Sequence, residues 1–179
     1  MRLRVRGRRM ALLLLGMTGM LIAGGCSTSE RECEPCYWEC RRIYPPSNEG
    51  EVTITQGVWG DVWFWQGIFF PGTCPPGTIR AVAREMRVHE LTHLDQVDFA
   101  PDGFPFYTAI HTQLVATVYS DSSGFFQVEL PPGQYSLFVV EDTLFYANFF
   151  SVDGNIFPVT VKEGRVAHRR FDITYKAAF

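Results

Sequence analysis

The chain has 179 residues, of which 46% are hydrophobic and 15% aromatic, and its formal net charge at pH 7 is −3. Residues 1–25 hold five arginines and no acidic residue, so the 179 − 25 = 154 residues from Cys26 onward carry a charge of −3 − 5 = −8. An acidic chain lacks the excess of lysine and arginine that neutralises phosphates, which excludes nucleic acid as an electrostatically bound partner. A length of 154 residues suits one domain with a real core.

The first 25 residues have the layout of a cleaved export signal. Five arginines within residues 2–9 precede an uncharged segment, Met10 to Gly25, that is too short to span a bilayer comfortably. The following Ala23-Gly24-Gly25-Cys26 is similar to the lipobox of bacterial lipoproteins, in which the cysteine after the cleavage site receives the lipid. An ordinary signal peptide, or a membrane anchor with a free Cys26, is the alternative.

This pattern predicts a signal peptide over residues 1–25 and a lipidated Cys26 whose acyl chains, palmitate among them, bind the membrane. The expected location is the bacterial cell envelope, and Ser27 is compatible with the outer membrane.

Residues 26–50 read as a cysteine-rich tether that ends in a Pro/Ser/Asn/Gly-rich stretch. Four cysteines remain when the lipidated Cys26 is set aside. An even number in an exported chain favours two disulfides, and four cysteines allow three pairings that the sequence does not separate. Free thiols and a four-thiolate zinc site are the alternatives, although a second C-x2-C pair is missing. The disulfide candidates are Cys33, Cys36, Cys40 and Cys74.

Residues 51–179 are expected to form one all-β domain. Short runs rich in β-branched and aromatic residues follow one another, and apolar and polar residues alternate in them, as at Phe126, Val128 and Leu130. The turn signals between the runs include Asp121-Ser122-Ser123-Gly124 and Asp153-Gly154-Asn155. Regular short strands with such turns are typical of a β-sandwich.

The stretch YSDSSGFFQVELPPGQYSLFVVE, residues 119–141, resembles the D-x-x-G-x-F-x-V-x-L-x-P-G-x-Y-x-L-x-V core of transthyretin-like, carboxypeptidase regulatory-like domains. GVWGDVWFWQG is similar to the opening strand of that family, and VTVKEGRVAHRRFDITYKA to its closing hairpin. The resemblance covers nearly all of residues 51–179, as in small lipoproteins of Bacteroidetes-type bacteria that carry this domain alone. It implies a seven-stranded Greek-key β-sandwich that serves as an accessory, stabilising or binding module, but fold does not grant function.

His89-Glu90-Leu91-Thr92-His93 matches the H-E-x-x-H zinc-protease pattern, which needs an α-helix to point both histidines at one metal. A helix over residues 82–97 has no clean apolar stripe, because charged residues fall among the apolar ones. An extended backbone instead separates His89 from His93 by about 13 Å, which is too far to share one zinc ion. We therefore expect a strand with a bulge near Glu90, and no catalytic or metal site there.

The aromatic run around Trp59, Trp63 and Trp65 is a candidate binding surface, although a packed core explains these residues as well. The sequence thus predicts a non-enzymatic envelope lipoprotein without a cofactor, a binding or structural module for an envelope protein or a glycan. Two alternatives stay open. One is a zinc-dependent hydrolase that uses His89, His93 and Glu90, and the other is a glycan-binding accessory lipoprotein of a carbohydrate-uptake system.

Overall fold

The computed structural model describes residues 44–71 and 77–179. The expected signal peptide over residues 1–25, most of the tether, the lipidation site Cys26 and the disulfide candidates Cys33, Cys36, Cys40 and Cys74 lie outside the described residues. The described chain forms twelve strands and two short 3₁₀ turns, η2 (Glu49–Glu51) and η3 (Leu94–Gln96). The strands are β1 (Gly57–Ile68), β2 (Thr78–Ala81), β3 (Glu85–Glu90), β4 (Val97–Phe99), β5 (Phe106–Ile110), β6 (Leu114–Tyr119), β7 (Phe125–Val128), β8 (Gly133–Glu141), β9 (Leu144–Tyr146), β10 (Pro158–Val161), β11 (Val166–His168) and β12 (Phe171–Ala178).

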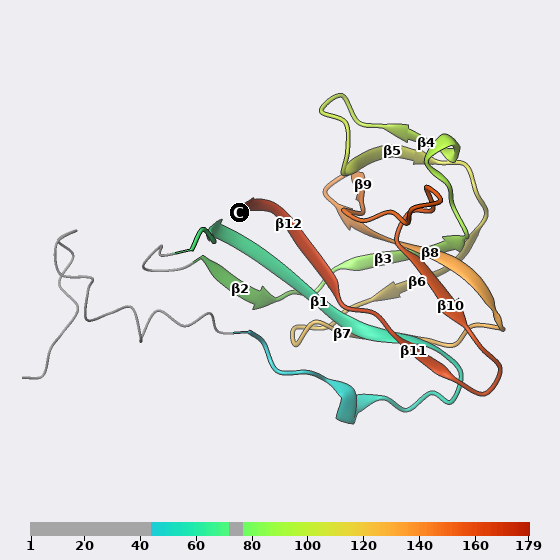
Figure 1. The fold of residues 1–179 in the computed structure, drawn as a ribbon. Helices are drawn as coiled ribbons and strands as arrows, with labels where there is room; N and C mark the ends of the chain where they lie inside the picture. Colours follow the sequence, from blue (N-terminus) through green and yellow to red (C-terminus); the bar gives the residue numbers. More distant parts are fainter. Residues whose placement is uncertain (1–43, 72–76) are drawn as a thin grey trace, which may run out of the picture.

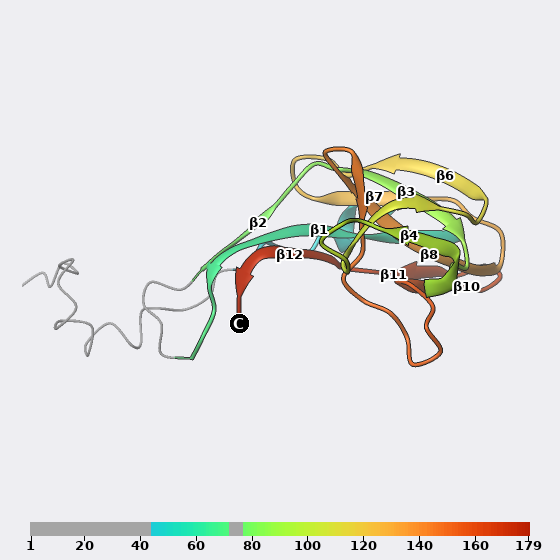
Figure 2. The same ribbon diagram turned by 90° about the horizontal axis from the view of Figure 1, so that it is seen from above.

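The strands form two sheets (Figures 1 and 2). In the five-stranded sheet, the first half of β1 pairs with β7 and β11, and the second half pairs with β2 and β12. The seven-stranded sheet has the order β4-β5-β9-β8-β3-β6, and β10 also pairs with β8. Strand β1 therefore pairs with all four remaining strands of its sheet. All pairings are antiparallel except the two parallel pairings of β1 with β11 and β12.

The expectation of an all-β sandwich is therefore confirmed. The described residues hold twelve strands where the family resemblance implied seven, and three of the twelve, β4, β9 and β11, have only three residues each. Among the described residues no helix is long and apolar enough to cross a membrane.

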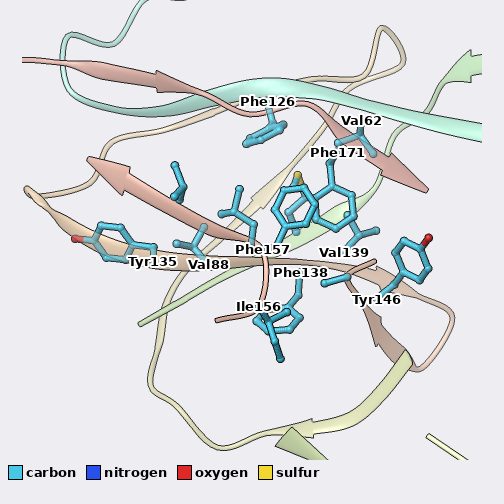
Figure 3. Packing of buried hydrophobic residues seen from close by; sticks show 14 of the residues in the cluster. Val62, Val88, Phe126, Tyr135, Phe138, Val139, Tyr146, Ile156, Phe157 and Phe171 are labelled. Carbon is cyan, nitrogen blue, oxygen red and sulfur yellow. The ribbon is translucent and has the colours of Figure 1, made fainter. Parts of the chain in front are cut away.

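A single large hydrophobic cluster fills the space between the sheets (Figure 3). Phe157 and Phe171 stack at its centre with ring centroids 4.2 Å apart. Burying a side chain of this size contributes about 1.5–3 kcal/mol, so the cluster is the main favourable term in the stability of the sandwich. Its fully buried members include Val58, Val62, Met86, Val88, Leu137, Val139, Tyr146, Ile156 and Ile173.

Strand β8 is buried on both faces, which the alternation in the sequence did not indicate. Tyr135, Leu137 and Val139 face the core, but Ser136 and Phe138 are also 0% exposed. The reason is a second layer on the far side of β8. His89 and Tyr107 pack edge-on against Phe138, and the Thr92 N–H donates to the Ser136 hydroxyl.

Residues 44–50 lie against the five-stranded sheet, although the sequence assigns them to the tether. The ring of Tyr44 contacts Trp63 and Trp65 at centroid distances of 6.0 and 5.9 Å. Further along, the Thr53 N–H donates to the Gln127 side chain. The folded unit therefore begins before the expected boundary at residue 51.

Candidate functional site

An open groove of about 480 Å³ lies where the C-terminal end of β12 meets the β9–β10 connection. Ligand sites of this size are common in proteins. We call it the aromatic groove. Its walls come from β1, from β12 and the C-terminal residue, and from the β9–β10 and β11–β12 connections. The lining residues are Trp65, Asn148, Phe149, Phe157, Arg169, Arg170, Asp172, Thr174 and Phe179.

Gly60 on β1 lets the β11–β12 connection approach the sheet. A Cβ atom at this position would lie 1.7 Å from the Arg169 carbonyl oxygen, so no other residue fits without moving the backbone. The Arg169 N–H in turn donates to the Trp59 carbonyl oxygen at 2.9 Å. This close crossing brings Arg169 and Arg170 to the groove.

The carboxylate of Asp172 organises one wall. It accepts a hydrogen bond from the Trp65 indole N–H and one from the Arg170 Nε, each at 2.9 Å. The Arg170 guanidinium also lies over the Trp63 ring, 4.8 Å from its centroid, which adds a cation–π attraction. Trp65 and Arg170 are thus held in fixed orientations before any ligand arrives.

The β9–β10 connection forms the opposite wall. Side-chain hydrogen bonds, and not backbone pairing between strands, hold it to the edge of β12. Asn148 donates both amide protons, to the Asp172 carbonyl oxygen and the Thr174 hydroxyl, each at 2.9 Å, which leaves its own side-chain oxygen as an acceptor. The Thr174 N–H donates to the Tyr146 hydroxyl. Burial raises the pKa of Tyr146, so this phenol stays neutral at physiological pH.

Two aromatic rings of the groove are open to solvent. Phe149 is 49% and Phe179 63% exposed, whereas Trp65 and Phe157 are 8% and 7% exposed. Phe149 packs edge-on against Phe157. Exposed ring faces next to arginine, asparagine and carboxylate groups suit a ligand that has both an apolar face and hydroxyl or charged groups.

The structure places the three tryptophans expected at a binding surface under other side chains. Trp59, Trp63 and Trp65 are 8%, 7% and 8% exposed. Trp59 stacks on His168 at 4.1 Å, and Tyr44 covers the other two. Tyr44, Phe179 and His168 thus cover their face of β1, and Trp65 alone of the three lines the groove.

The other groove residues carry no signal in the sequence. Asn148, Arg169 and Phe179 come from separate segments that only the folded chain brings together. Phe149 and Phe157 stand within runs that read as ordinary strand or core sequence. A search of the sequence for local motifs therefore does not identify the groove.

The expectation of an extended backbone at the H-E-x-x-H sequence is confirmed. His89 and Glu90 end β3, a bulge interrupts its pairing with β6 between Val88 and His89, and His93 lies beyond the strand. The His89 Nδ1 atom pairs with the Thr112 carbonyl oxygen at 3.0 Å, and burial is the main cause that lowers the pKa of this ring.

His93 has a different role, because it caps the 3₁₀ turn η3. Its Nδ1 atom lies 2.8 Å from the Asp95 Oδ1 atom and 3.3 Å from the Asp95 backbone nitrogen. Among residues 44–71 and 77–179, no three His, Cys, Asp or Glu side chains gather closely enough to hold a metal ion.

Comparison of the chain with protein-family models, with curated proteins and with solved structures finds no match.

Proposed function

We propose that this protein is a non-enzymatic binding module of the transthyretin-like type, which a lipid on Cys26 holds in the bacterial cell envelope, in the outer membrane. The aromatic groove is its contact site. The observation that carries the proposal is the combination of exposed Phe149 and Phe179 rings with the preorganised Trp65–Asp172–Arg170 wall on a rigid sandwich. Rigid scaffolds that present such sites in their connections are typical of binding modules.

The anchor is tested on the full chain expressed in a bacterial host that lipidates exported proteins. Labelling with an alkyne-bearing palmitate analogue is expected to mark the wild type, and the mature protein is expected in the membrane fraction. Cys26→Ala should lose the label. The matched control is Cys74→Ser, which removes a cysteine outside the lipobox and should keep the label. Equal labelling of wild type and Cys26→Ala would contradict a lipid at this position.

A glycan is the ligand class that the groove fits best. Sugar rings present an apolar face to aromatic side chains and hydroxyls to groups such as Asn148, Arg169 and Asp172. The test is a glycan array probed with the detergent-purified lipoprotein, followed by titration of any sugar that binds. Phe179→Ala and Asp172→Ala should each weaken binding by about tenfold, which corresponds to about 1.4 kcal/mol.

The matched control for the groove is Tyr119→Ala, since Tyr119 is 66% exposed on β6 and lies outside the groove. This variant should bind as the wild type does. Equal binding by Phe179→Ala and the wild type would place the glycan elsewhere and remove the groove from the proposal.

A zinc-dependent hydrolase has less support, because His89 and His93 are engaged by separate partners, Thr112 and Asp95. Metal analysis of the untagged protein tests it directly. Stoichiometric zinc that is lost in the His89→Ala, His93→Ala double variant would favour the hydrolase over the binding module.

A further inference from the structure

Positive charge is absent from the middle of the chain. Residues 88–161 contain no lysine or arginine but nine acidic residues. This stretch builds most of the seven-stranded sheet and all of its connections after β3. In the described residues, the basic side chains are therefore confined to other parts: Arg80, Arg84, Arg87, Lys162, Arg165, Arg169, Arg170 and Lys176.

Within this acidic part, two neighbouring connections expose large apolar side chains. Phe99 and Phe104 belong to β4 and the β4–β5 connection, and Phe150 and Val152 to the β9–β10 connection. Their exposed fractions are 45%, 44%, 45% and 106%. We call these four residues the loop patch. Soluble proteins expose single apolar residues everywhere, but a group on adjacent loops is characteristic of an interaction surface.

The two connections are joined to each other. The Phe104 and Phe150 rings meet edge-to-face with centroids 5.5 Å apart. Next to them, the Ala147 N–H donates to the Pro105 carbonyl oxygen at 3.1 Å. Phe104 and Phe150 thus form one continuous surface across the two connections, with Phe99 at the end of β4 and Val152 in the β9–β10 connection.

Backbone hydrogen bonds also hold the β9–β10 connection in one shape. The Gly154 N–H donates to the Ser151 carbonyl oxygen in a tight turn with Val152 near its tip. The Leu94 N–H donates to the Gly154 carbonyl oxygen, and the Ile156 N–H to that of Thr92. A surface that is already ordered loses little entropy when it binds, which favours affinity.

Acidic residues lie beside the patch in the sequence and in the fold. Asp98 precedes Phe99, Asp102 stands in the same connection as Phe104, and Asp153 follows Val152. All three are exposed. This rim repels anionic lipid surfaces and anionic polysaccharides, and it attracts cationic groups.

We propose that the loop patch docks a protein segment that places apolar side chains between lysines or arginines. The apolar side chains would cover Phe104 and Phe150, and the cationic groups would pair with Asp98, Asp102 and Asp153. Figure 1 shows β4 and β5 far from the first described segment, drawn in blue before β1, so a partner bound to the patch would not contact that segment. The inference goes beyond the groove and does not depend on a glycan ligand.

The experiment uses the detergent-purified lipoprotein and a set of synthetic peptides of about twelve residues that combine leucine with lysine, in alternating and in helical spacing. Matched peptides replace lysine by glutamate, or leucine by serine. Affinity is measured by titration, and hydrogen exchange locates the bound peptide. We expect a leucine–lysine peptide to bind in a salt-sensitive manner and to protect amides in residues 99–106 and 150–156 from exchange.

Phe104→Ser, Phe150→Ser should weaken this binding by about tenfold or more. Asp98→Asn, Asp102→Asn, Asp153→Asn should weaken it several-fold and remove most of its salt dependence. The changed side chains are all exposed, so the variants should keep the thermal unfolding curve of the wild type. The matched control is Phe70→Ser, which removes a ring of 51% exposure outside the patch and should leave binding unchanged.

Three results would overturn the proposal. The first is failure of every leucine–lysine peptide to bind. The second is equal binding by the wild type and the Phe104→Ser, Phe150→Ser variant. The third is protection of the same amides by phosphatidylglycerol or phosphatidylcholine vesicles, without peptide, in the reconstituted lipoprotein, which would make the patch a membrane contact.

Discussion

The side-chain amide of Asn48 donates a hydrogen bond to the carboxylate of Asp61 at 2.8 Å. Both residues are buried, with exposures of 6% and 2%. The same amide also donates to the Ser123 carbonyl oxygen, so a single side chain ties the chain before β1 to β1 itself and to the β6–β7 turn. The segment before β1 is thereby part of the sandwich.

Removing this side chain should loosen the N-terminal segment. Asn48→Ala leaves the buried Asp61 carboxylate short of its closest donor, so we expect the free energy of unfolding to fall by about 1–3 kcal/mol. Protease cleavage within residues 44–56 should also become faster. Urea unfolding and limited proteolysis measure the two effects. Ser47→Ala, at a neighbouring exposed position, is the control, and equal cleavage of both variants would contradict the role of Asn48.

Glu141 joins the two sheets, because it accepts a hydrogen bond from the Tyr175 hydroxyl at 2.8 Å and pairs with the Arg84 guanidinium. Burial, followed by the hydrogen bond to Glu141, raises the pKa of Tyr175 to about 12. Glu141→Gln should lower the free energy of unfolding by about 1–3 kcal/mol and move the Tyr175 pKa back toward its ordinary value of 10.0.

Chemical unfolding and an NMR titration of labelled tyrosines check this prediction, with Tyr175→Phe to assign the signal. Glu85→Gln removes a more exposed carboxylate that pairs with Arg87 and serves as the control. An unchanged Tyr175 titration in Glu141→Gln would show that burial alone sets its pKa.

His89 should make stability depend on pH. Burial lowers its pKa most strongly; the hydrogen bond to the Thr112 carbonyl opposes this change, and Arg87 adds to it. The unfolded chain therefore binds a proton more readily than the folded chain. The stabilising contribution of neutral His89 is complete above the unfolded value of 6.5 and is lost as the pH falls through the lower folded-state pKa.

Urea unfolding at about pH 7.5 and pH 5 measures this dependence. The loss of unfolding free energy on acidification should be smaller in His89→Asn than in the wild type, whatever the absolute stability of the variant. His111→Asn, which changes a side chain of 56% exposure, is the control. An equal slope in the wild type and His89→Asn would assign the acid sensitivity to other groups.

Local chemistry in the sequence predicts the strands and turns well. Asp121 accepts hydrogen bonds from the N–H groups of Ser123 and Phe125, and Gly124 has a φ of +82°, as the Asp-Ser-Ser-Gly turn signal indicates. Phe126 and Leu130 are buried while Glu129 is exposed, as the period-2 pattern indicates. These features depend on neighbours in the chain, so a single sequence is sufficient to find them.

Features that depend on distant contacts escaped prediction. Nothing in QYSLFVVE shows that His89 and Thr92 cover the second face of β8. The covering of Trp63 depends on Tyr44, and the groove on the meeting of Asn148 with β12. The residues of each pair are far apart in the sequence, and residues of these types occur in cores, in turns and on open surfaces alike.

The parallel pairing of β1 with β12 has a mechanical consequence. A force that draws Gly57, at the start of β1, and Ala178, at the end of β12, in opposite directions pulls these neighbouring strands past each other along their length. In this shear geometry the backbone hydrogen bonds between β1 and β12 bear the load together, whereas in a peeling geometry they would break one after another. The β1–β12 pair therefore resists a force that acts along its strands.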